Sequence, residues 1–175
     1  MTRMSPGFTA RIAGVFYLLT FVTGITALVV RGRVGVAAGL TAAACYVAVT
    51  LLVYVLFKPV SKRLSLLAAS VSLAGIIVGP LRLTDVSSLV FFGFYCLLIG
   101  YLIFRSIFLP RALGALMAFS SVGWLTFLSP SLAKNLYPYN LAPGILGEGA
   151  LTVWLLAVGV DVPRWNEQAA SRMQI

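Results

Sequence analysis

The sequence contains no histidine, four acidic residues and two cysteines. Without histidine, haem ligation by imidazole, His-based zinc or di-iron sites and histidine acid–base catalysis are excluded. Cys45 and Cys96 lie inside apolar runs and form no CxxC pair, which disfavours a thiol–disulfide enzyme and predicts that both pack as small hydrophobes. No GxSxG, P-loop or Asp-rich phosphotransfer motif is present. We therefore predict no catalytic residue, no metal site and no cofactor.

Charged side chains are scarce as a class. They make up 10% of the chain and hydrophobic residues 61%, whereas soluble globular proteins average about 25% and about 45–50%. A water-soluble fold of 175 residues needs more polar surface than this composition supplies. The composition predicts an integral membrane protein with the lipid bilayer as its main partner.

Six apolar stretches fill the space between the charged residues. Each is 17 to 24 residues long and lacks period-2 alternation, which predicts membrane-spanning helices rather than strands. The first is longer than the ~7–15 residues of a signal-peptide core, which favours a retained helix. We predict an all-α six-helix bundle in one transmembrane domain, residues 12–160, between a cytoplasmic N-terminus, 1–11, and a cytoplasmic tail, 161–175. The spans are 12–30, 34–57, 64–81, 86–104, 112–130 and 144–160.

The basic residues have a one-sided distribution. The net charge of +9 is spread over the ends of the apolar stretches, with no basic helix, so we predict topogenic anchors and no nucleic-acid partner. Nine of the 13 Lys and Arg residues fall on the side of the two termini. This places both termini in the cytoplasm of a multi-pass protein of the inner or plasma membrane. The connection and N-terminal anchors are Arg11, Lys58, Lys62, Arg63, Arg105 and Arg111.

Glu148 is the strongest candidate for a functional residue, because it lies inside the sixth apolar stretch between two glycines. An acid in a membrane span is costly, so it must be paired, protonated or turned to the bundle interior. Arg82 is predicted on the same outer side, and the two form either a structural ion pair or a polar pocket. Asp85 either caps the fourth helix or pairs with Arg82. Tyr95 adds a hydroxyl to the site or is an ordinary core aromatic.

Small residues recur at helical spacing. Gly35-xxx-Gly39 and Gly75-xxx-Gly79 are typical of close helix contacts. They serve packing within one chain, or they form the seam of a homodimer.

Four strings resemble a known family: ARIAGVFYLLTFVTGI from Ala10, VLFKPVSKRLSLLAA from Val55, VFFGFYCLLIGYLIFRSIFLPRALGALM from Val90 and APGILGEGALTVWLLAVGV from Ala142. Together they are similar to the bacterial membrane proteins of domain-of-unknown-function family 4386 (DUF4386). The resemblance implies a polytopic helical membrane protein and brings no reaction, substrate or cofactor. It gives weight to Glu148 in the GE string and to the loop anchors Arg105 and Arg111. The chain looks shorter than typical members, chiefly around the outward connections, and Tyr95 stands where members often carry histidine; if that histidine serves an activity, this chain lacks it.

Three functions fit these features. The leading hypothesis is a protein that binds or permeates a small molecule or lipid at a polar intramembrane site near the outer face, formed by Glu148, Arg82, Asp85 and Tyr95. No inverted repeat supports the transporter form of this hypothesis. The alternative is a non-enzymatic accessory or structural membrane protein. A lipid-modifying enzyme has no positive support in the sequence.

Overall fold

The chain folds into helices throughout the part that the computed structural model describes, residues 5–81 and 87–172. No strand occurs in these two ranges, and the all-α prediction is confirmed. The elements are α1 (Pro6–Val29), α2 (Arg33–Phe57), α3 (Lys62–Leu81), α4 (Ser88–Arg105), α5 (Arg111–Leu125), the 3₁₀ turn η1 (Thr126–Leu128), α6 (Pro130–Leu136), α7 (Leu141–Ala157) and α8 (Val162–Ser171).

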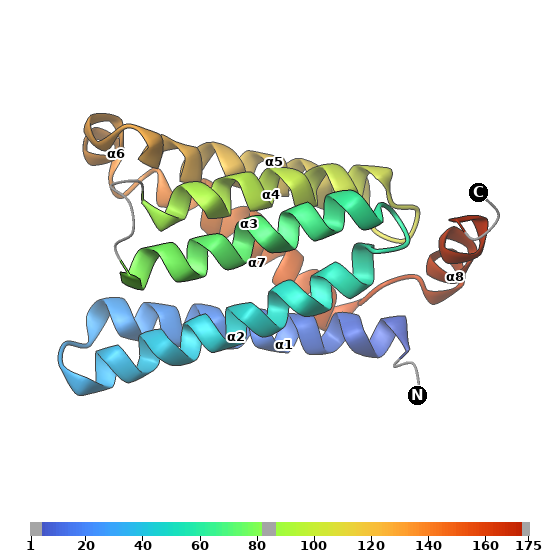
Figure 1. Ribbon diagram of the computed structural model, residues 1–175, viewed down its shortest axis with the longest axis horizontal. Helices are drawn as coiled ribbons and strands as arrows, with labels where there is room; N and C mark the ends of the chain where they lie inside the picture. The colour runs from blue at the N-terminus through green and yellow to red at the C-terminus, as the bar shows by residue number, and fades with distance from the viewer. Residues whose placement is uncertain (1–4, 82–86, 173–175) are drawn as a thin grey trace.

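Six of these helices form a closed ring. Each of α1 to α4 packs against the next helix in the chain, and α5 packs against α7. The ring closes because α7 packs against α1. Figure 1 shows the helices running side by side along the long axis, with α1 and α8 meeting at one end. At that end the α-carbon of Gly7 approaches Val162, whose Cγ2 would lie 3.3 Å from an added Cβ. Because short connections join sequential helices, neighbours alternate in direction.

Most helices of the ring are long and apolar enough to cross a lipid bilayer. Five helices can cross a membrane, and a sixth crossing follows if α6 and α7, which are bent by 80°, count as one span. The outward side chains of the ring are large and apolar, as lipid contact requires; examples are Val22, Leu40 and Val153, each more than half exposed. A multi-pass membrane protein is therefore confirmed. The assignment of the termini to the cytoplasm stays a prediction.

Local chain chemistry sets the helix ends. Gly32 adopts a φ of +82°, which permits the tight turn between α1 and α2. Gly159, with a φ of +79°, ends α7 by donating its N–H to the carbonyl of Trp154. For this reason α7 ends at Ala157. The helix begins at Leu141, so both of its ends are three residues earlier than those of the predicted sixth span. Ser87 rather than Asp85 is the N-cap of α4, which begins two residues later than predicted.

Two helices in the polar segments were not predicted. The short α6 lies at the end of the bundle remote from α8 (Figure 1) and starts at Ser129 and Pro130, a typical N-cap and first-turn pair. Helix α8 occupies the predicted tail. Its Trp165 Nε1 donates to the carbonyl of Leu56 at 2.9 Å, and its Gln168 bonds the backbone of the α4–α5 connection. The tail therefore covers the end of the bundle where the termini lie.

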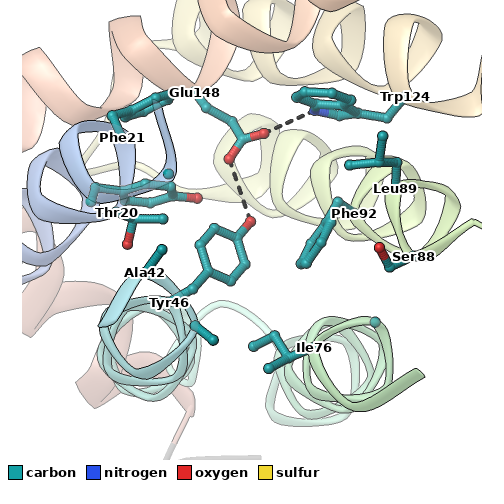
Figure 2. Close-up of a pocket in the computed structure, with 14 residues that line it drawn as sticks. Thr20, Phe21, Ala42, Tyr46, Ile76, Ser88, Leu89, Phe92, Trp124 and Glu148 are labelled. Carbon is teal, nitrogen blue, oxygen red and sulfur yellow. Dashed lines mark hydrogen bonds between the residues drawn. The ribbon is translucent and has the colours of Figure 1, made fainter. Parts of the chain in front are cut away.

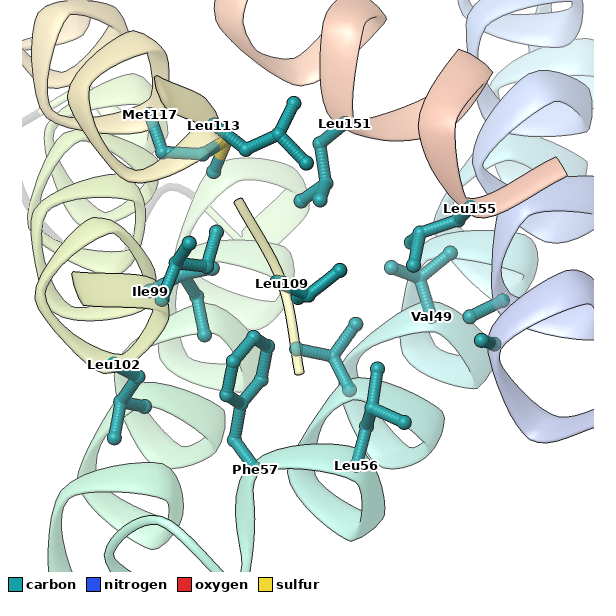
Figure 3. Close-up of a cluster of buried hydrophobic side chains, with 14 of the residues drawn as sticks. Val49, Leu56, Phe57, Ile99, Leu102, Leu109, Leu113, Met117, Leu151 and Leu155 are labelled. Carbon is teal, nitrogen blue, oxygen red and sulfur yellow. The ribbon is translucent and has the colours of Figure 1, made fainter. Parts of the chain in front are cut away.

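The ring is filled along the half nearest α8. Aliphatic and aromatic side chains from α2, α4, α5 and α7 meet there on the bundle axis (Figure 3), including Phe57, Ile99, Met117, Leu151 and Leu155, each at most 1% exposed. Burial of these side chains excludes water and lipid from this half.

Glycines lie at several of the closest helix contacts inside the ring. Gly100 and Gly114 face each other across α4 and α5; a Cβ on Gly100 would lie 2.9 Å from the Gly114 carbonyl oxygen. Gly75 and Gly79 lie against Phe91 and Ser88 of α4 in the same way. These positions serve packing within one chain. A homodimer seam stays a prediction.

Candidate functional site

A cavity of about 400 Å³ occupies the other half of the ring. Its walls come from the second halves of α1, α3 and α5 and the first halves of α2, α4 and α7, so it lies on the side remote from the termini. All six ring helices contribute to it. The lining residues are Tyr17, Thr20, Phe21, Gly24, Ala42, Ala43, Tyr46, Gly75, Ile76, Ser88, Leu89, Phe92, Trp124 and Glu148.

Glu148 lines this cavity from α7. It is the eighth residue of α7, about 10 Å along the axis from the start of the helix and near its middle. This is deeper than the predicted position, because α7 begins at Leu141. Its side chain is 6% exposed and points into the cavity from α7 (Figure 2).

Glycines and a hydroxyl hold α7 against α5 beside Glu148. An added Cβ on Gly147 would lie 2.7 Å from Ser120 Oγ, and one on Gly144 would enter the indole ring of Trp124. Ser120 Oγ donates to the carbonyl oxygen of Gly144 at 3.0 Å. The close approach brings the Trp124 indole level with the Glu148 carboxyl group.

Three donors converge on that carboxyl group. Trp124 Nε1 donates to Oε1 at 2.9 Å, the thiol of Cys96 lies 3.6 Å from the same oxygen, and the Tyr46 hydroxyl donates to Oε2 at 3.4 Å. Figure 2 shows the first and last of these contacts, in which Trp124 and Tyr46 approach the Glu148 carboxyl group from two sides. The donors come from α5, α4 and α2 and all are neutral. A carboxylate accepts at about four lone-pair positions, so Oε2, with one long bond, keeps acceptor capacity toward the cavity.

No Lys or Arg of the described ranges pairs with Glu148. The ion pair that those ranges do contain joins Arg164 of α8 to Asp161, the N-cap of the same helix, at 3.4 Å. The predicted partners Arg82 and Asp85 lie outside the described residues, and their part in the site stays a prediction. Among the residues that the structure does describe, no group of three His, Cys, Asp or Glu side chains is placed to hold a metal ion.

Three tyrosines, Tyr17, Tyr46 and Tyr95, pack together near the Glu148 carboxyl group. The Tyr46 ring lies 5.9 Å from that of Tyr17 and 6.1 Å from that of Tyr95, both edge-on. The hydroxyls of Tyr17 and Tyr95 are buried and have no hydrogen-bond partner within the described ranges. Tyr17 lines the cavity, whereas Tyr95 packs behind Tyr46 and does not. Of the four predicted site residues, the structure thus places Glu148 at the cavity and Tyr95 next to it.

The predicted anchors gather at the opposite end. Arg11 is in the first turns of α1, Lys58 follows the end of α2, and Lys62 and Arg63 begin α3. Arg105 and Arg111 flank the α4–α5 connection. All six anchors are exposed at the end where α1 begins and α8 docks. This matches the charge asymmetry that positive-inside counting uses.

Sequence reasoning missed Tyr46, Trp124 and Tyr17, and it assigned Cys96 only a packing role. Each of the four is at or near the level of Glu148 once the helices alternate in direction. The signal in the sequence was the presence of hydrogen-bonding side chains near the middle of otherwise apolar spans.

Comparisons with known proteins reach the same part of the chain. An uncharacterised protein of Archaeoglobus fulgidus is 29% identical over 125 residues, covering 65% of this chain and 76% of the relative. No solved structure matches. Residues 82–159, which include Cys96, Trp124 and Glu148, match the sequence model of a family described as a domain of unknown function, DUF4386. The resemblance of this chain to the DUF4386 family is therefore confirmed over residues 82–159.

Proposed function

We propose that the protein binds a small, mostly apolar molecule or a lipid in the cavity, with a polar group of the ligand at Glu148. The observation that carries this proposal is that a buried carboxyl group, that of Glu148, lines a cavity to which all six ring helices contribute. Walls that are mostly apolar with a few convergent polar groups are typical of small-molecule sites, whose volumes are about 300–1,000 Å³.

The small side chains on the cavity wall favour binding over a purely structural role. Larger side chains at Ala42, Ala43 or Gly24 would fill this space. Their small size supports a cavity kept for an occupant.

Native mass spectrometry of the protein extracted in a mild detergent tests the proposal. We expect a bound mass on the wild-type chain. Gly24→Phe places a ring where an added Cβ meets no atom within 4 Å on the cavity wall, and we expect it to abolish the bound mass.

Val22→Phe is the matched control, because it places the same ring on the lipid-facing side of α1, where Val22 is 54% exposed. It is expected to keep the bound mass. A wild-type chain without any bound mass, or equal loss in both variants, contradicts the proposal and favours an accessory role.

A further inference from the structure

We infer that the cavity selects a lipophilic organic cation, an ammonium group with apolar substituents, and that Glu148 is its counter-charge. This inference rests on the proposed binding function and specifies the chemical class of the ligand. It starts from the imbalance of charge around Glu148.

Among the residues that the structure describes, Glu148 is the one charged residue on the cavity wall, and the other lining residues are neutral. Its three hydrogen-bond donors are an indole, a phenol and a thiol, none of which carries a positive charge. When the carboxyl group is ionised, no positive charge on the described part of the cavity wall offsets its negative charge, and the surroundings have a low dielectric constant. A cationic ligand removes this imbalance. An anionic ligand doubles it, and a neutral ligand leaves it in place.

The rings around the carboxylate favour the same class. Phe92 and Trp124 line the cavity and lie to the right of the Glu148 carboxyl group in Figure 2, with Phe21 to its left and Tyr46 below it. Faces of aromatic rings attract cations, by about 0.5–1 kcal/mol when exposed and about 2 kcal/mol when desolvated. Carboxylate and rings together form an anionic aromatic site.

The Tyr17 hydroxyl supplies a second polar contact. Tyr17 lines the cavity, and its hydroxyl oxygen is buried and has no hydrogen-bond partner within the described residues. A hydroxyl without a partner can rotate to present its oxygen lone pairs to a cation. Apolar walls, among them Ile76 and Leu89, then accommodate the substituents of the ammonium group.

A matched pair of probes tests the inference. Benzyltrimethylammonium and neopentylbenzene have the same shape, and only the first carries a charge. We would titrate each by isothermal calorimetry into the full chain in phosphatidylcholine nanodiscs, with empty nanodiscs as the partition control. The wild-type chain is expected to bind the cation at least about tenfold more tightly than the neutral probe, a ratio that corresponds to about 1.4 kcal/mol.

Variants at two positions locate the effect. Glu148→Gln keeps the size of the side chain and is expected to reduce the two affinities to parity, whereas Glu148→Asp keeps the charge and the preference. Phe92→Leu is expected to lower the affinity for the cation by about twofold to thirtyfold, because the ring face is lost, and the affinity for the neutral probe by less. Circular dichroism and thermal unfolding check that each variant is folded. If Glu148→Gln does not fold, Phe92→Leu still tests the preference for the cation.

Equal affinities in the wild-type chain, or a preference that survives Glu148→Gln, overturn the inference. Failure of both probes to bind overturns it as well. These outcomes remain distinct from failure of the proposed function, which is judged by the bound mass on the wild-type chain and its loss in Gly24→Phe.

Discussion

The contact between Gly144 and Trp124 provides a sharp test of the site. Replacing Gly144 by alanine adds a Cβ that would lie 2.8 Å from Trp124 Nε1 and closer still to two carbons of the same ring. The indole must move, and its hydrogen bond to Glu148 Oε1 is expected to break. Gly149→Ala is the matched control, since Gly149 lies on the same helix next to Glu148 and its added Cβ meets nothing within 4 Å.

The two substitutions are expected to change the free energy of unfolding in opposite directions. Alanine is more favourable than glycine in a helix by about 1 kcal/mol, so Gly149→Ala is expected to be neutral or stabilising. Gly144→Ala gains the same amount but incurs an overpacking cost of about 1–3 kcal/mol. Loss of the indole bond leaves a buried acceptor less satisfied, at about 1–3 kcal/mol more. Gly144→Ala is therefore expected to be less stable than Gly149→Ala by about 2–6 kcal/mol.

Thermal unfolding of both variants in the same detergent measures this difference. A double-mutant cycle with Trp124→Leu assigns it, because the shorter side chain relieves the clash and is expected to reduce the penalty of Gly144→Ala by at least about 1 kcal/mol. Equal melting temperatures for the two alanine variants would refute the packing of Trp124 on α7, and with it the positioning of the indole at Glu148.

Other contacts give smaller tests. Thr50 and Ser72 share a 2.7 Å hydrogen bond between α2 and α3, so Thr50→Val is expected to lower the free energy of unfolding by about 1 kcal/mol, and Ser72→Ala in the Thr50→Val background to cost much less than alone; additive losses would contradict this coupling. Trp165→Phe removes the indole bond to Leu56, and limited proteolysis should then cleave α8 faster at an unchanged melting temperature of the bundle. Tags on both termini are expected to report the cytoplasm, and opposite compartments would refute the charge count.

The helices of the ring followed from the length of the apolar runs. Each predicted span overlaps one ring helix, because a bilayer requires about 20 apolar residues whatever their identity. Helices α6 and α8 were missed for the opposite reason: both are short and partly polar, and they depend on local caps and docking. Ser129 and Asp161, which cap them, are visible in the sequence but are equally typical of loops.

The site was predictable only in part. Glu148 was found because an acid inside an apolar run is expensive wherever it packs. Its neighbours were not found, since tyrosine, tryptophan and cysteine are ordinary residues of membrane cores and interfaces. Tyr46 and Glu148 are 102 positions apart, and only the closure of the ring by α7 against α1 and α5 brings them to one level. That closure is a property of packing and not of any single segment.

The hydrogen bond between α2 and α3 differs from the contacts of Glu148 in a way that bears on function. Where α2 and α3 need a hydrogen bond, the chain uses two neutral hydroxyls, Thr50 and Ser72, which are at most 1% exposed and pair with each other. Neutral pairs of this kind stabilise membrane helices by about 1 kcal/mol and carry no charge into the bilayer. A carboxylic acid in the middle of a span costs about 2.5–3.5 kcal/mol on insertion scales, and a glutamine at position 148 would accept from the Trp124 indole at lower cost. Structural support alone does not need an acid where the packed half of the ring meets the cavity, and this position supports the proposal that the cavity takes a positively charged ligand.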